Sequence, residues 1–238
     1  EIYRLKSLIR TTQIAISKPS RTNCKRTIAT DRRHPDFSNL VEFGNLFCQL
    51  DIAVKFATNI NVTMRKLRTT ELNRLDVEEF KSAKKTPVVI VLDNVRSLLN
   101  VGSVFRTSDA FRFSKIFLCG ITPTPSLEMN KTALGAIDSV EWEHCKDIKT
   151  ALQSLRSEGY SVYGVEQTDS SVELDAITSF PKKVAVILGN EVKGVSVEAL
   201  ELCDEIIEIP QQGTKHSLNV SVCGGIISWE LYKHLRVK

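Results

Sequence analysis

The sequence predicts an α/β fold, in which a mostly parallel sheet is flanked by helices, and three observations lead to it. From residue 86 onward, short apolar runs rich in β-branched residues recur, and stretches with helical spacing lie between several of them. The runs are apolar throughout, which is typical of strands buried on both faces of a parallel sheet. A chain of 238 residues that is 42% hydrophobic also has ample material for a packed core.

Strands and helices are expected to alternate along the chain. The predicted strands cover residues 88–92, 115–119, 161–165, 184–188 and 205–209. The predicted helices cover residues 100–111, 147–158, 197–203 and 217–235. In an open sheet of this kind, ligands bind beyond the carboxyl ends of the strands, so functional residues are expected in the loops that follow strands.

Composition disfavours several classes of protein. The chain has no run of about 18 apolar residues, so a transmembrane helix is not expected. Its first residues lack the apolar core and cleavage site of a secretory signal. The six cysteines are scattered without a C-x-x-C pair, which favours reduced thiols in a cytoplasmic protein over disulfides or a metal site. Residues 64–238 carry 22 Lys and Arg against 23 Asp and Glu, so their bulk charge gives no support for nucleic-acid binding.

The first unusual loop opens the stretch "LLNVGSVFRTSDAFRF" at residues 98–113. Asn100 is a good N-cap for a helix with one apolar face toward the sheet. That face consists of Val101, Val104, Phe105 and Phe111. Gly102, Arg106 and Asp109 follow helical spacing and are expected on the opposite face. The spacing alone leaves two interpretations evenly balanced: a solvated face with an Arg–Asp pair, or part of a functional site.

The second loop is "LGNEVKGVS" at residues 188–196, where two glycines permit a tight turn. Its spacing mimics a phosphate-binding P-loop, but Val195 follows Gly194 where that loop needs a lysine, so a nucleotide triphosphatase is disfavoured. Glu191 is either a polar anchor or an exposed loop acid, and the sequence alone favours the second. No G-x-G-x-x-G follows a strand and no G-x-S-x-G is present, which disfavours a Rossmann-type nucleotide loop and a hydrolase elbow.

The third loop is "IPQQGTKHSLNVSVCGGIISWEL" at residues 209–231. Pro210 ends a strand, and Ser217 or Asn219 is expected to cap a final helix. Small residues recur on that helix, and close packing within the chain is their plainest explanation. His216 has no second ligand nearby, so no metal site is predicted.

Taken together and in this order, the three loops resemble the motifs of the SpoU/TrmH family of the SPOUT superfamily, the RNA ribose 2′-O-methyltransferases. "NVGSVFRTSDAF" resembles the first motif, "ILGNEVKGVS" the second and "IPQQGTKHSLNVSV" the third, while "KTALGAIDSVEW" resembles the connecting stretch of shorter members. The likeness covers residues 86–235. It implies a carboxyl-terminal trefoil knot, an exception to the rule that chains are unknotted, and a homodimer with active sites at its interface.

The resemblance also implies S-adenosylmethionine as the cofactor and RNA, either tRNA or rRNA, as the substrate. The residues expected to hold the cofactor are Leu118, Cys119, Gly120, Leu188, Gly189, Asn190, Glu191, Ile209 and Leu218. The expected catalytic residues are Arg106, Asn100, Glu191, Ser217 and Asn219. Neither a metal nor a membrane is implied. The alternatives are a non-catalytic RNA-binding protein that keeps this fold, and an unrelated α/β enzyme that binds a small nucleotide.

By this family analogy Arg106 is central to removing the proton of a ribose 2′-hydroxyl. It acts either as a base or as a cation that stabilises the developing alkoxide, and the second is favoured because arginine stays protonated in proteins. Two positions depart from the family pattern. Arg112 stands where members often have a glycine, and Gln211 stands where an apolar residue is common, so both are expected to influence substrate fit.

The domain organisation follows from composition. Residues 1–63 are predicted to be an atypical basic extension, either foreign to the native protein or disordered, because they carry ten Lys and Arg against five Asp and Glu and lack sustained periodicity. Met64 is the hypothesised native start, and the alternative is a genuine basic RNA-binding arm. Residues 64–85 are predicted to be a short basic segment that contacts phosphates or is merely solvated, and residues 86–238 the SpoU-type methyltransferase domain.

Overall fold

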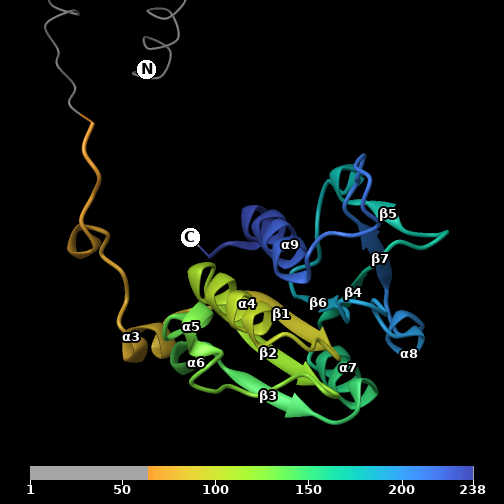
Figure 1. The fold of residues 1–238 in the computed structure, drawn as a ribbon, viewed down its shortest axis with the longest axis horizontal. Coiled ribbons are helices and arrows are strands. Elements are labelled where there is room, and N and C mark those ends of the chain that lie inside the picture. The colour runs from red at the N-terminus through yellow and green to blue at the C-terminus, as the bar shows by residue number, and fades with distance from the viewer. Residues whose placement is uncertain (1–63, 238) are drawn as a thin grey trace, which may run out of the picture. The chain divides into compact units, whose positions relative to one another are not determined.

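The computed structural model describes residues 64–237, and from Leu67 onward these residues form one compact unit (Figure 1). The predicted extension over 1–63 lies outside the described residues. The strands are β1 (Thr86–Asp93), β2 (Phe113–Cys119), β3 (Trp142–Cys145), β4 (Ser161–Val165), β5 (Val172–Glu173), β6 (Val184–Leu188) and β7 (Glu205–Glu208). The α-helices are α3 (Val77–Ser82), α4 (Leu98–Ala110), α5 (Asn130–Ala133), α6 (Ala136–Ser139), α7 (Ile148–Ser157), α8 (Val197–Leu200) and α9 (Val220–Leu235).

The seven described strands form one sheet in the order β3-β2-β1-β6-β4-β7-β5, and every neighbouring pair is parallel. This confirms the predicted α/β class with a parallel sheet, and all five predicted strands are present. Strand β6 comes late in the sequence but lies between β1 and β4. The carboxyl ends of β1, β6, β4 and β7 therefore meet at one edge of the sheet, which is where ligand sites form in such folds.

Helices cover both faces of the sheet (Figure 1). In β1, Val88, Ile90 and Leu92 point into a core shared with α4, α5, α6 and α9. The alternate residues Val89 and Val91 point into a second core shared with α7 and α8. Because both cores bury alternate residues of the same strand, the strand reads as apolar throughout instead of alternating.

The sequence did not predict β3, β5 or the short helices α3, α5 and α6. Strand β3 is an edge strand in which Trp142, Glu143 and His144 are exposed, so it carries no apolar run. Strand β5 has only two residues and lies at the other edge. Edge strands with little burial lack the hydrophobic pattern on which such a prediction depends.

Two expectations for the helix after β1 are wrong. Helix α4 begins at Leu98 because Ser97, not Asn100, is the N-cap, and the Ser97 hydroxyl accepts a hydrogen bond from the Asn100 N–H at 3.3 Å. Gly102 is buried instead of lying on a solvated face. A Cβ on Gly102 would lie 2.2 Å from Oγ1 of Thr132 in α5, so the glycine lets the two helices approach closely.

The final helix begins as expected. Asn219 is the N-cap of α9, and its side-chain oxygen accepts a hydrogen bond from the Ser221 N–H at 2.9 Å. A Cβ on Gly224 would lie 2.9 Å from Cδ1 of Leu188, so the small residue brings α9 close to β6. Among the described helices, none is long and apolar enough to cross a membrane.

Candidate active site

A cavity of about 520 Å³ opens at the carboxyl ends of β4, β6 and β7. Each wall is a segment that directly follows one of these strands, together with the start of α9. The lining residues are Val165, Glu166, Gln167, Leu188, Gly189, Asn190, Glu191, Val192, Lys193, Gly194, Glu208, Ile209, Gln211, His216, Ser217, Leu218, Asn219, Val220 and Cys223. The second and third unusual loops of the sequence thus face one another across this cavity.

Most of the residues predicted for the site line the cavity. They are Leu188, Gly189, Asn190, Glu191, Ile209, Ser217, Leu218 and Asn219. Leu118, Cys119 and Gly120, also predicted to hold the cofactor, do not line this cavity. The side chains of Leu118 and Cys119 are fully buried in the core, and β1 separates the end of β2 from β6.

The loop after β6 is held in a tight turn. Asn190 and Gly194 exchange two backbone hydrogen bonds of 2.9 Å, and Gly194 has a φ of +69° that glycine adopts without strain. A Cβ on Gly189 would lie 2.2 Å from the carbonyl carbon of Gly194, so the two strands of the turn touch there. The Asn190 side chain donates to the backbone oxygen of Asn94 at 2.7 Å, which fastens the turn to the end of β1.

Glu191 joins this turn to the amino terminus of α4. Its carboxylate accepts hydrogen bonds of 3.0 Å from the backbone N–H groups of Arg96 and Ser97, which lie immediately before the helix. Burial raises the pKa of Glu191, but these bonds and one from Asn100 lower it by more, so the pKa lies below its ordinary value. Glu191 is exposed, as the favoured interpretation has it, but it is more than an exposed loop acid, because its hydrogen bonds make it a polar anchor at a helix terminus.

Three side chains connect the three motif loops by direct hydrogen bonds. The Asn100 amide NH₂ donates to Glu191 at 3.0 Å, and the Asn219 amide NH₂ donates to the Asn100 side-chain oxygen at 3.2 Å. The direction of these two hydrogen bonds is fixed. An ionised carboxylate can only accept, so Glu191 orients the NH₂ group of the Asn100 side chain toward itself. The oxygen of Asn219 is then left to accept from the N–H and the hydroxyl of Ser221 in the first turn of α9. We refer to Glu191, Asn100 and Asn219 as the loop-linking triad.

A second carboxylate, not predicted from the sequence, braces the same turn. Glu166 follows β4, lines the cavity and accepts a hydrogen bond from the Val195 N–H at 2.8 Å. The buried Asp93, at the end of β1, accepts from the Ser196 N–H at 2.8 Å. The signal for Glu166 was present, since it directly follows the predicted strand 161–165 and so lies at the edge where ligands bind.

Arg106 lies on α4 outside the cavity, six residues beyond Asn100 and so about 9 Å along the helix axis. It is exposed, and it makes no hydrogen bond or ion pair with the residues that the structure describes. The Asp109 carboxylate accepts a hydrogen bond from the Ser139 hydroxyl rather than pairing with Arg106. The guanidinium is therefore free to meet an anionic partner.

Other catalytic chemistries find no support in the part of the chain that the structure describes. His216 lines the cavity, but no three His, Cys, Asp or Glu residues there are grouped to hold a metal. The described cysteines are free thiols. Burial raises the pKa of Cys223, which borders the cavity, to about 11, so this thiol is protonated at neutral pH and is a poor nucleophile.

The cavity fits S-adenosylmethionine in size and in chemistry. Its volume falls within the range of about 300–1,000 Å³ that is usual for small-molecule sites. Leu188, Ile209 and Leu218 offer apolar walls, and the turn at 189–194 offers backbone groups beside them. Glu166 and Glu191 supply acidic groups near the walls, which suit a ligand that carries a sulfonium and hydroxyl groups.

The fold and this site define a class of protein. The chain belongs to the SpoU rRNA Methylase family, which matches residues 87–229. It is 30% identical over 148 residues to the tRNA (guanosine(18)-2′-O)-methyltransferase TARBP1 of Mus musculus, covering 60% of this chain and 9% of that protein. It is 31% identical over 162 residues to the tRNA (guanosine(18)-2′-O)-methyltransferase of Thermus thermophilus, covering 68% of this chain and 82% of that protein.

A solved structure resembles the chain as well. It is that of an AdoMet-bound rRNA methyltransferase from Sinorhizobium meliloti, with a TM-score of 0.60 and 30% sequence identity. The likeness covers 65% of this chain and 59% of that one. The chain therefore spans less than two thirds of two of these three relatives, and most of the Thermus protein.

Proposed function

We propose that this protein is an S-adenosylmethionine-dependent RNA ribose 2′-O-methyltransferase that acts on tRNA or rRNA. The observation that carries the proposal is the loop-linking triad, which ties both walls of the cavity to the helix that presents Arg106. The relatives support it, since the mouse and Thermus proteins are named tRNA 2′-O-methyltransferases and the Sinorhizobium protein was solved with AdoMet bound.

The cofactor would be held by the apolar walls Leu188, Ile209 and Leu218 and by backbone groups of residues 189–191. Bound there, S-adenosylmethionine supplies an electrophilic methyl group. The proposed trefoil knot would be formed by the segments after β6 and β7. It is supported by the insertion of β6 between β1 and β4 and by the closeness of both segments around one cavity.

The residues of this chain would prepare the ribose for attack. The 2′-hydroxyl would give up its proton to water as its oxygen takes the methyl group and the methyl–sulfur bond breaks, and negative charge would develop on that oxygen during the step. The Arg106 guanidinium donates hydrogen bonds to this oxygen or to the adjacent phosphate, and its fixed positive charge stabilises the transition state. Ser217, whose hydroxyl is exposed and bonds to no described residue, would contact the substrate, whereas Asn100, Glu191 and Asn219 hold the loops in place.

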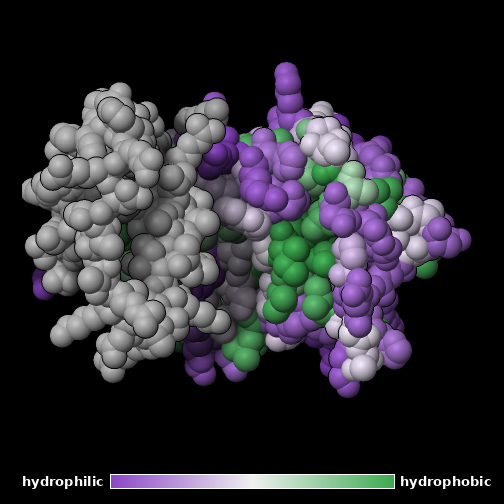
Figure 2. All heavy atoms as spheres, turned by 90° about the horizontal axis from the view of Figure 1, so that it is seen from above, coloured by the Kyte–Doolittle hydropathy of each residue, from purple (hydrophilic) through white to green (hydrophobic). Residues whose placement is uncertain are grey.

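A homodimer would complete the site. Val222, Ile226 and Trp229 are exposed apolar residues at helical spacing on α9, and Leu99 of α4 is exposed as well. Figure 2 shows hydrophobic surface over this helix, bordered by polar residues. We call these four residues the apolar strip. A second copy seated on the strip would bring its surface beside the free Arg106, and this arrangement puts the active site at the interface.

The proposed methyltransferase domain spans residues 86–238 and begins with β1. Residues 64–85 would be a basic segment for substrate phosphates. We also infer a cytoplasmic location, which the free state of the four described cysteines supports, since thiols are kept reduced there.

The test combines cofactor binding with mapping of the product. We expect calorimetry to detect S-adenosylmethionine binding. In a separate assay, we expect the protein to transfer labelled methyl groups to unmodified tRNA or rRNA. A deletion strain should lack one 2′-O-methylated nucleotide that the complemented strain has. An RNA complex without cofactor binding would instead support the alternative of a non-catalytic RNA-binding protein with this fold.

A further inference from the structure

Arg112, just beyond the end of α4, has a backbone conformation that disfavours an arginine. Its φ is +51°, in the left-handed region, where a side chain crowds the following carbonyl and where helices usually place a glycine. The short side chain of an asparagine can form a hydrogen bond to the neighbouring backbone in this conformation. The long side chain of an arginine gains no such bond. A strained position that keeps a long charged side chain indicates that the side chain has a use.

The backbone around Arg112 brings a second cation beside it. The Thr86 N–H donates to the Arg112 carbonyl at 2.8 Å, and the Thr86 hydroxyl donates to the Phe111 carbonyl at 2.9 Å. Lys85, the residue before Thr86, therefore runs alongside Arg112. Its ammonium lies over the Phe80 ring, 4.0 Å from the ring centre, which fixes the charge in place.

These two cations are short of compensating negative charge. Burial first, and the positive charge of Arg112 second, lower the pKa of Lys85, and the attraction of Asp109 and Glu141 offsets this only in part. Glu141 is itself engaged by Lys115 at 3.3 Å, and Asp109 accepts from the Ser139 hydroxyl. The Arg112 guanidinium makes no hydrogen bond or ion pair with any residue that the structure describes.

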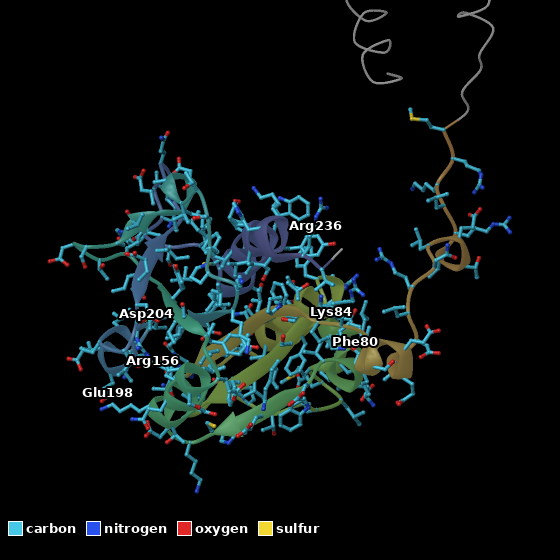
Figure 3. All side chains as sticks on the ribbon, turned by 180° about the vertical axis from the view of Figure 1, so that it is seen from behind. Phe80, Lys84, Arg156, Glu198, Asp204 and Arg236 are labelled. Atoms are coloured by element: carbon cyan, nitrogen blue, oxygen red, sulfur yellow. The ribbon has the colours of Figure 1, made fainter. Side chains whose placement is uncertain are left out.

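Two more cations lie close by. Lys84 is exposed and its ammonium is likewise unpaired among the described residues. The Tyr232 ring of α9 packs on Phe111 with 4.9 Å between ring centres, and the Arg236 N–H donates to the Tyr232 carbonyl, so the end of α9 lies near Arg112. Figure 3 shows Lys84 and Arg236 at the same end of the compact unit. We call Lys84, Lys85, Arg112 and Arg236 the terminal basic cluster.

We propose that the terminal basic cluster binds phosphates of the RNA backbone, away from the reacting atoms. The polymer is identified as RNA through the proposed function, and the cluster itself requires only closely spaced phosphates. Along α4, Arg112 lies six residues beyond Arg106, or about 9 Å at the rise of an α-helix, so this contact serves a phosphate beside the group that Arg106 meets and not the reacting atoms themselves. Contacts of this kind set the register of the nucleic acid and carry little sequence information.

A purely structural role for Arg112 predicts that its removal changes stability and not RNA binding. A cation just past the carboxyl end of a helix also interacts favourably with the helix dipole. If that were its role, removal of the charge would destabilise the protein and leave RNA binding unchanged. The Arg112→Gly variant separates the two explanations, because glycine relieves the left-handed backbone while it removes the charge.

The experiment measures binding of unmodified tRNA transcripts by fluorescence anisotropy over a range of salt concentrations, without cofactor. For Arg112→Gly we expect a several-fold loss of affinity at low salt and a salt slope reduced by about one, with the midpoint of thermal unfolding unchanged or raised. Lys84→Ala should have the same effect on the slope. Lys149→Ala, which removes an exposed lysine of α7 on the other face of the sheet, is the matched control and should leave the slope as it is.

The outcomes separate this inference from the proposed function. A wild-type affinity and salt slope for Arg112→Gly overturns the inference, whether or not the protein transfers methyl groups. A lowered unfolding midpoint with unchanged RNA binding also overturns it and assigns Arg112 to the helix end. A reduced slope in a protein that transfers no methyl group supports the cluster and counts only against the enzyme. In an active enzyme, the variant should raise KM for RNA and leave kcat unchanged.

Discussion

Arg106 is the residue on which the proposed chemistry depends most, and its surroundings make it a clean target. Its side chain is exposed and bonds to no described residue, so truncation removes no structural contact. We expect Arg106→Ala to lower kcat for methyl transfer about 10²–10³-fold, the usual cost of removing one group that stabilises an oxyanion. Cofactor affinity by calorimetry and the free energy of unfolding should stay at their wild-type values.

Two further variants sharpen that prediction. Arg106→Lys keeps the positive charge but loses the planar fork of donors, so a stabilising cation should recover part of the lost rate. Arg156→Ala is a control, because this arginine lies on α7, where it pairs with Asp204 at 2.7 Å (Figure 3), and its removal should not affect the rate. An Arg106→Ala enzyme with wild-type kcat would remove Arg106 from the mechanism.

The surroundings of Asn100 show why it was wrongly predicted to be the N-cap of α4. Ser97 and Asn100 are both good N-cap residues three positions apart, and propensity does not choose between them. The choice is made by Glu191, which is 91 residues beyond Asn100 and takes its amide as a hydrogen-bond donor. Sequence spacing therefore located the amino terminus of the helix only to within one turn, and it could not reveal a partner that only the folded sheet brings near.

Glu191 couples one element to another, since the turn after β6 caps the start of α4 through it. We expect Glu191→Gln to lower the free energy of unfolding by about 1 kcal/mol at neutral pH, the typical value for a capping group. The pKa of Glu191 is depressed in the folded protein, so the stabilisation is present above the unfolded pKa and is lost as the pH falls through the folded pKa. The difference between the two proteins should therefore shrink below about pH 4.5.

Urea unfolding at neutral and acidic pH measures this difference. Glu201→Gln is the matched control, because Glu201 is exposed at the end of α8 and its carboxylate bonds to no described residue. Its unfolding free energy should match that of the wild type at both pH values. A Glu191→Gln difference that persists unchanged at acidic pH would mean that the carboxylate charge is not what anchors the turn.

Elements were predictable where burial was deep on both sides. Strand β6, buried at all five positions, appears in the sequence as an unbroken apolar run and was predicted at its true bounds. Strand β3 is exposed at three of its four positions and gave no such run. The burial of Gly102 escaped prediction for a related reason, since the helix that covers it, α5, is a single turn without a periodic pattern.

At the scale of the molecule, the order of strands decides which predicted residues meet. The loops after β6 and β7 were expected to form the cofactor site, and they do line one cavity. The end of β2 was expected there as well, but β1 stands between β2 and β6 in the sheet. Strand order is set by long-range pairing that local patterns do not encode, so the sequence could name the strand ends but not which of them are neighbours.

The assembly of two copies is the property of the whole molecule that is most open to test. We expect light scattering to give the wild-type protein twice the mass of one chain, and the Val222→Asp variant the mass of one chain. Val222 is 52% exposed in the apolar strip, and in a dimer a carboxylate at this position would be buried without a partner. Val197→Asp on α8, at a site that is 70% exposed, is the matched control and should stay dimeric. If methyl transfer needs the interface, the Val222→Asp monomer should keep its fold by circular dichroism and lose most of its kcat. A fully active monomer would show that one chain holds a complete site.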